Sequence, residues 1–129
     1  QMMMDESEEF GRHEGLGLVP GRVEAIPKTG ANGKRHKIPH IGWNKIHPPK
    51  SAADWHDSIF RNTRRENAVY FVHSFNCAPS HAKHRLADSD YNGRTISAAI
   101  NRDNMYGCQF HPEKSGETGL EILKQFLLL

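Results

Sequence analysis

The sequence has few cysteines, no long apolar run and almost no net charge. Its two cysteines, Cys77 and Cys108, do not make a disulfide framework in a chain of 129 residues. No apolar run approaches the roughly 18 residues of a membrane span, and no secretory signal pattern is visible. We therefore expect neither export nor membrane insertion, and we expect the protein to work in the cytoplasm.

The charge is too small to argue for a nucleic-acid partner. The formal net charge is +2, and hydrophobic residues make up 36% of a polar but globular composition. Basic residues gather at 34–37 and 61–65, in polar segments without interleaved aromatic residues. Solvated loops explain such clusters better than an RNA-binding face does, so we expect no nucleic-acid binding.

The nine histidines raise the question of a metal site. His36 and His40 lie four residues apart, but Pro39 and an alternating pattern place them on a strand rather than on one helical face. His81 and His84 lie in a polar stretch that is expected to be a loop. No Cys-x-x-Cys or His-Glu-x-x-His motif accompanies them, so we expect no metal and no other cofactor.

The length fits at most one domain with its own core. Residues 1–10 are helix formers followed by glycines and are expected to be helical, and residues 68–74 form a continuous apolar run typical of a buried central strand. A C-terminal helix is expected to start either at a capping box of Thr118 and Glu121 or at Ser115. These elements indicate an α/β or α+β fold. The expected strands are 22–26, 37–46, 68–74, 95–101 and 105–110, and the expected C-terminal helix is 115–129.

The most informative stretch is 107–116, where an apolar run ends in a His-Pro-Glu turn just before the C-terminal helix. His111 and Glu113 are two residues apart, so one rigid turn can let the carboxylate orient the imidazole. That arrangement supplies the base and its orienting acid in a nucleophilic triad. The alternative is that both residues only cap or decorate the start of the helix. Their position between a buried strand and a helix favours the catalytic interpretation.

An obvious nucleophile for this base is missing. Ser74 follows His73 at the end of an apolar strand, but adjacent strand residues point to opposite faces, so they do not form a pair. The backbone there could instead hydrogen-bond a substrate. Cys108 lies in an apolar strand, where burial makes a thiol inert, and Cys77 is expected in a loop without a strand–turn–helix elbow. Both cysteines are expected to be structural.

Four co-linear stretches carry a resemblance to a known family. Residues 107–116 (GCQFHPEKSG) are similar to the C-terminal motif of class I (triad) glutamine amidotransferases. Three further stretches narrow this to the glutaminase subunits of imidazole glycerol phosphate synthases: 15–21 (GLGLVPG), 38–44 (IPHIGWN) and 70–75 (YFVHSF). The resemblance runs over residues 1–129. It implies a flavodoxin-like α/β fold with a mixed sheet, of which this chain is a partial domain resembling the C-terminal two-thirds.

The resemblance also implies roles for individual residues. Gln1 matches the glutamine of the family's Gly-x-Cys-x-Gly-x-Gln nucleophile elbow, so the nucleophilic cysteine is expected just before it, and residues 1–129 alone are expected to be inactive. His111 matches the general acid/base and Glu113 its orienter. Gln1, Ser74 and Phe75 match positions that hold the substrate glutamine. Phe75 stands where many members have tyrosine, which removes a possible hydrogen bond near that pocket.

In this family the ammonia passes to a (β/α)8-barrel cyclase subunit that acts in histidine biosynthesis. Trp43 and Lys114 fall in motifs that lie at the interface with that partner. Related subunits deliver ammonia for surface-polysaccharide sugars, and the sequence does not exclude that acceptor. A non-catalytic binding or regulatory subunit with the same fold is a second alternative. A metal- or RNA-binding module is the weakest alternative.

Overall fold

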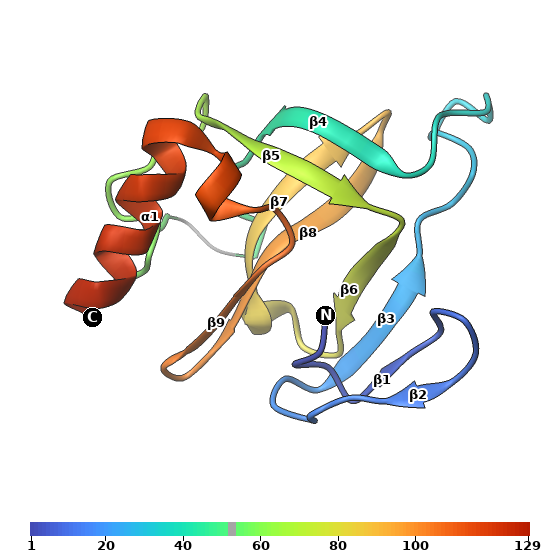
Figure 1. Cartoon of the computed structure of the whole chain (residues 1–129), viewed down its shortest axis with the longest axis horizontal. Coiled ribbons are helices and arrows are strands. Elements are labelled where there is room, and N and C mark those ends of the chain that lie inside the picture. The colour runs from blue at the N-terminus through green and yellow to red at the C-terminus, as the bar shows by residue number, and fades with distance from the viewer. Residues whose placement is uncertain (52–53) are drawn as a thin grey trace.

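Three β-sheets and a C-terminal helix form the fold in the computed structural model, which describes residues 1–51 and 54–129 (Figure 1). The elements in chain order are β1 (Glu6–Ser7), β2 (His13–Glu14), β3 (Gly21–Ala25), β4 (His40–Lys45), β5 (Ala68–His73), β6 (Phe75–Pro79), the 3-10 turn η1 (Ala82–His84), β7 (Arg85–Tyr91), β8 (Arg94–Arg102), β9 (Met105–Cys108), the 3-10 turn η2 (Pro112–Lys114) and α1 (Gly116–Leu128).

The sheets have the strand orders β2-β1-β3-β6, β4-β5 and β7-β8-β9. Strand β1 runs parallel to β3, whereas the other paired strands named here are antiparallel. The chain leaves the β4–β5 pair and enters the first sheet at a single residue, Ser74, which forms the corner between β5 and β6 (Figure 1). This mixed-sheet architecture with a packed helix agrees with the expected α/β class.

The main hydrophobic core lies between β4–β5, β7–β8 and α1. The rings of Phe71 on β5 and Phe110, which follows β9, meet edge-on with centroids 5.9 Å apart. Ile122 of α1 is buried in the same cluster, and so is Ile96 of β8. Each fully buried side chain of this size stabilises the fold by about 1.5–3 kcal/mol. The core therefore ties the C-terminal helix and the segment before it to β5.

The helix expected over residues 1–10 is wrong, because these residues form turns and β1. The carbonyls of Met2, Met3 and Met4 accept hydrogen bonds from backbone N–H groups of residues 16, 19 and 17, at 2.9, 2.9 and 3.1 Å. Met4 is also fully buried in a second, smaller core cluster. Tertiary pairing with the glycine-rich segment 15–21 overrides the local helix propensity.

The five strand predictions are confirmed with changed boundaries as β3, β4, β5, β8 and β9, and four strands are additional: the two-residue strands β1 and β2, and β6 and β7. Strands β6 and β7 were not predicted, because their sequences lack an apolar alternation. Within β7, the buried Asp88 is stabilised by Arg85, whose Nη2 lies 2.6 Å from its Oδ1. Strand β5 is half-buried rather than buried on both faces: Phe71 is inside, whereas Val72 is 39% exposed. The only partner of β5 within the described residues is β4.

The predicted C-terminal helix is confirmed, and it begins just after Ser115. The prediction of a capping box at Thr118 and Glu121 is wrong. Glu121 instead accepts a hydrogen bond from Asn62 Nδ2 at 2.7 Å. Among the described residues, no helix is both long enough and apolar enough to cross a membrane.

Gly119 allows α1 to lie close to the turn before it. A Cβ atom at this position would be 1.8 Å from the carbonyl oxygen of Pro112. We expect Gly119→Ala to lower the free energy of unfolding by about 1–3 kcal/mol, because the helix and the turn must move apart. Urea denaturation of the purified protein measures this change. Lys124→Ala, on the exposed side of the same helix, is the control and should change stability by less than about 0.5 kcal/mol. Equal stabilities for the two variants would contradict this account of the contact.

Candidate active site

The His-Pro-Glu turn is attached to β5 through the main chain of one residue, Tyr70. The backbone N–H of His111 donates to the carbonyl of Tyr70 at 3.0 Å. The N–H of Tyr70 donates to Ser115 Oγ at 3.0 Å, and that hydroxyl donates in turn to the carbonyl of His111 at 2.6 Å. Ser115 is 2% exposed, so this connection is shielded from water. The turn is thus fixed to the sheet at both of its ends.

His111 and Glu113 form the hydrogen bond that the sequence predicts. Nδ1 of His111 lies 2.9 Å from Oε1 of Glu113. A carboxylate only accepts hydrogen bonds, so Nδ1 carries the hydrogen and Nε2 is left as the basic atom. The backbone N–H of Glu113 itself lowers the pKa of its carboxyl group, and the His111 imidazole lowers it further. The side chains are 40% and 60% exposed, so small molecules can reach the pair.

Gln1 connects two segments near this turn. Its Nε2 donates to the carbonyl of Phe75 and to Oε1 of Gln109, both at 3.0 Å. Gln109 lies two residues before His111, and the sequence analysis missed it although it belongs to the 107–116 motif. Ser74, the remaining predicted substrate residue, lies at the corner between β5 and β6, where its carbonyl accepts from the N–H of Ile26 at 2.9 Å. The structure therefore brings Gln1 and Phe75 into contact and holds the corner at Ser74 in place.

Trp43 and Lys114, predicted to face a partner, lie on neighbouring parts of the surface. Trp43, on β4, is 59% exposed, and its ring meets that of Tyr70 at a centroid distance of 6.0 Å. A Cβ atom on Gly116 would lie 3.9 Å from the indole ring, so Trp43 also flanks the start of α1. Lys114 is the exposed last residue of η2 and lies two residues before Gly116 in the sequence.

Both cysteines are poor nucleophiles in this structure. The prediction that Cys77 lies in a loop is wrong, because it is buried in β6 between other backbone-paired residues. Burial raises the pKa of the Cys77 thiol, and burial raises that of Cys108, at the end of β9, to about 12. Such thiols are almost entirely protonated near neutral pH and react slowly.

The remaining histidines do not form a metal centre in the described part of the chain: across 1–51 and 54–129, no three side chains of metal-binding type come together. His84, expected in a loop, belongs instead to η1 and is buried.

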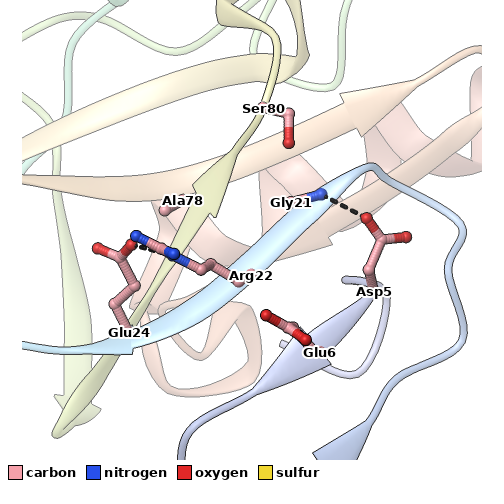
Figure 2. Close-up of a pocket in the computed structure, with 7 residues that line it drawn as sticks. All are labelled: Asp5, Glu6, Gly21, Arg22, Glu24, Ala78 and Ser80. Atoms are coloured by element: carbon pink, nitrogen blue, oxygen red, sulfur yellow. Dashed lines mark hydrogen bonds and ion pairs between the residues drawn. The ribbon is translucent and has the colours of Figure 1, made fainter.

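A separate hollow of about 480 Å³ lies over β1, β3 and β6 (Figure 2). Arg22 is paired there with Glu24, and Asp5 accepts from the N–H of Gly21 at 2.8 Å. These charged groups already have partners, so we place the candidate active site at His111 and Glu113 and not in this hollow.

Comparison with known proteins gives a consistent match. The sequence model of the family described as "Glutamine amidotransferase class-I" matches residues 1–129. Imidazole glycerol phosphate synthase subunit HisH 1 of Legionella pneumophila (strain Lens) is 56% identical over 127 residues, which are 98% of this chain and 60% of that protein. The HisH subunit of Syntrophotalea carbinolica is 46% identical over 98% of this chain and 59% of its own length. The HisH subunit of Chlorobaculum tepidum is 38% identical over 98% and 58%. The chain thus spans about 60% of the length of the curated relatives that it matches.

Replacing Ser115 tests the attachment of the turn. Ser115→Ala removes the acceptor for Tyr70 N–H and one donor for the His111 carbonyl, which keeps only the N–H of Lys114 at 3.0 Å. We expect the free energy of unfolding to fall by about 1–3 kcal/mol, measured by urea denaturation. The matched control is Ser51→Ala, because Ser51 is exposed and its hydroxyl makes only a long contact of 3.4 Å to Ala82 O. A loss no larger than that of the control would mean that the turn does not depend on Ser115.

Proposed function

This chain belongs to the class-I glutamine amidotransferase family, and we propose that it forms part of a glutaminase subunit of imidazole glycerol phosphate synthase. The complete subunit would hydrolyse glutamine to glutamate and ammonia in the cytoplasm. The ammonia would pass to a (β/α)8-barrel cyclase partner in histidine biosynthesis. The observation that carries the proposal is the hydrogen bond of 2.9 Å between His111 and Glu113, on a turn that β5 holds in place.

In the proposed reaction, a cysteine thiolate attacks the side-chain amide carbon of glutamine. His111 Nε2 transfers a proton to the departing nitrogen, which leaves as ammonia, and water then hydrolyses the thioester to release glutamate. Glu113 remains ionised and keeps the hydrogen of His111 on Nδ1. The protonated thiols of Cys77 and Cys108 do not suit the role of nucleophile, so we propose that this cysteine belongs to sequence outside residues 1–129.

We propose that Gln1 and the Ser74–Phe75 backbone hold the substrate. The amide of Gln1 donates a hydrogen bond to the carbonyl of Phe75. It also donates to the side chain of Gln109, two residues before His111. Polar main-chain groups fixed in this way can recognise the amino-acid part of glutamine without a charged pocket of their own. Phe75 lacks the hydroxyl of the tyrosine common in the family, so recognition here would use the main chain more than the side chain.

We propose that the cyclase docks over Trp43 and Lys114. A large indole ring that is 59% exposed on a regular strand is typical of an interface anchor, because aromatic residues are enriched in such positions. Lys114 is exposed at the end of η2, two residues before Gly116, and its ammonium group can pair with a carboxylate of the partner. This surface adjoins the catalytic turn, so a partner bound there would lie close to the site of ammonia release.

The assignment of His111 and Glu113 is tested in the full-length subunit combined with its cyclase partner. Glutamate release should fall by about 10²–10⁴-fold in His111→Ala, because the proton transfer is lost. Glu113→Gln should lower kcat less than His111→Ala does, because the amide can still bond to the imidazole but no longer fixes its hydrogen on Nδ1. The surface variant Lys124→Ala is the control and should keep full activity. Full activity of His111→Ala would refute the proposed role, and no glutamine turnover by the wild-type pair would favour a non-catalytic subunit.

The two cysteines provide a separate test. Cys77→Ala and Cys108→Ala should each keep glutaminase activity within about threefold of wild type in the full-length pair, as for residues that contribute packing and no chemistry. Residues 1–129 alone should release no ammonia from glutamine. Loss of activity in a folded Cys77→Ala or Cys108→Ala protein would identify that residue as the nucleophile, and ammonia release by the isolated chain would also overturn the proposal.

A further inference from the structure

Two buried histidines that take no part in the proposed reaction face each other across β4 and β5. His40 and His73 are directly paired in the antiparallel register and are 3% and 6% exposed. Nδ1 of His40 lies 2.9 Å from Nε2 of His73. Buried polar side chains require partners, and here the two imidazoles supply one to each other.

The hydrogens in this pair can be assigned from the partners. Nδ1 of His73 lies 2.8 Å from the carbonyl oxygen of Phe75, and a carbonyl can only accept, so Nδ1 carries the hydrogen. Burial lowers the pKa of His73, and it lowers that of His40 to about 4, so both rings are neutral near pH 7. The unprotonated Nε2 of His73 therefore accepts from Nδ1–H of His40. The chain of donors points in one direction, from His40 through His73 to Phe75.

Aromatic rings hold His40 in place on both sides. It stacks on Phe71 at a centroid distance of 4.9 Å and an interplanar angle of 21°. It also stacks on Tyr91 of β7 at 4.1 Å and 25°. Rings packed in this way leave His40 little freedom to rotate, so its Nδ1–H stays directed at His73.

The chain of hydrogen bonds ends on the backbone of the proposed substrate segment. The carbonyl of Phe75 accepts from Nδ1 of His73 at 2.8 Å and also from Nε2 of Gln1 at 3.0 Å. The carbonyl before it, that of Ser74, is held by the N–H of Ile26 at 2.9 Å. His73 therefore fixes the direction of a carbonyl at the corner where the chain passes from one sheet to another.

We propose that His73 is a positioning residue for the glutamine pocket, which it shapes by holding the Phe75 carbonyl, and that His40 fixes His73 in the required tautomer and orientation. The inference rests on the proposed glutaminase function. It assigns this pair a role in substrate affinity, beyond the stability that any buried hydrogen bond gives.

Two substitutions at His73 separate these roles. The amide nitrogen of asparagine can occupy the place of Nδ1, so His73→Asn can still donate to the Phe75 carbonyl. The amide of glutamine reaches the place of Nε2, so His73→Gln keeps a polar group beside His40 but loses the bond to Phe75. In the full-length subunit with its cyclase, we expect His73→Gln to raise the KM for glutamine by about 5- to 10-fold, and His73→Asn by less than about threefold.

Two substitutions at His40 provide a second pair. His40→Asn keeps a donor at the Nδ1 position, whereas His40→Phe keeps the stacked ring but loses the donor. The KM for glutamine should rise more in His40→Phe than in His40→Asn, with kcat changed less than KM in both. His84→Gln, at a buried histidine of η1 outside this network, is the control and should lower the melting temperature without changing KM.

The outcomes are distinguishable. In one outcome, the wild-type subunit with its cyclase turns over glutamine, but KM follows only the melting temperature across all five variants. The His40–His73 pair is then purely structural, and the inference is overturned while the proposed function stands. If the wild-type pair shows no glutamine turnover, the proposed function itself fails, and the inference fails with it. If the His73 variants do not fold, the order of KM in the two His40 variants decides, and equal KM values overturn the inference.

Discussion

Hydrogen bonds to the main chain of Tyr70 hold the turn of the candidate active site against β5. The carbonyl of Tyr70 accepts from His111 N–H and its N–H donates to Ser115 Oγ, so a single residue of β5 holds the turn at both ends. Strands hold their backbone direction more rigidly than loops do, and a catalytic turn attached to a strand inherits that rigidity. The hydrogen bond between His111 and Glu113 then has to fix only the imidazole, because the position of the backbone is already determined.

Two histidines on or beside β5, His73 and His111, lie in opposite environments. At the end of β5, His73 is buried and pairs with His40, and burial keeps both rings neutral near pH 7. Beside the middle of β5, His111 is 40% exposed and its Nδ1 is hydrogen-bonded to the Glu113 carboxylate, which leaves Nε2 as the atom that can exchange a proton. A neutral ring has one donor and one acceptor and so suits a directional link, whereas a ring that gains and loses a proton suits catalysis. Exposure and the identity of the partner, not the residue type, separate the two roles.

The sequence predicted the parts of the site that are close together along the chain. His111 and Glu113 are two residues apart, so local spacing was enough to predict their hydrogen bond. The helix over 1–10 failed because its backbone groups pair with residues 15–21, and no local pattern contains that pairing. Strand β7 was missed because its buried Asp88 depends on Arg85, which makes a core strand look polar. The contact of Gln1 with Phe75 joins residues 74 positions apart, and only the resemblance to a family pointed to it.

Tyr70 also connects the candidate site to the proposed partner surface. Trp43 and Tyr70 are directly opposite in the β4–β5 register, and their rings are in contact. The side chain of Tyr70 thus supports the exposed indole, while its main chain holds the turn of His111 and Glu113. Because hydrogen bonds to the main chain do not depend on the identity of the side chain, the support of the surface and the support of the turn can be altered separately at this position.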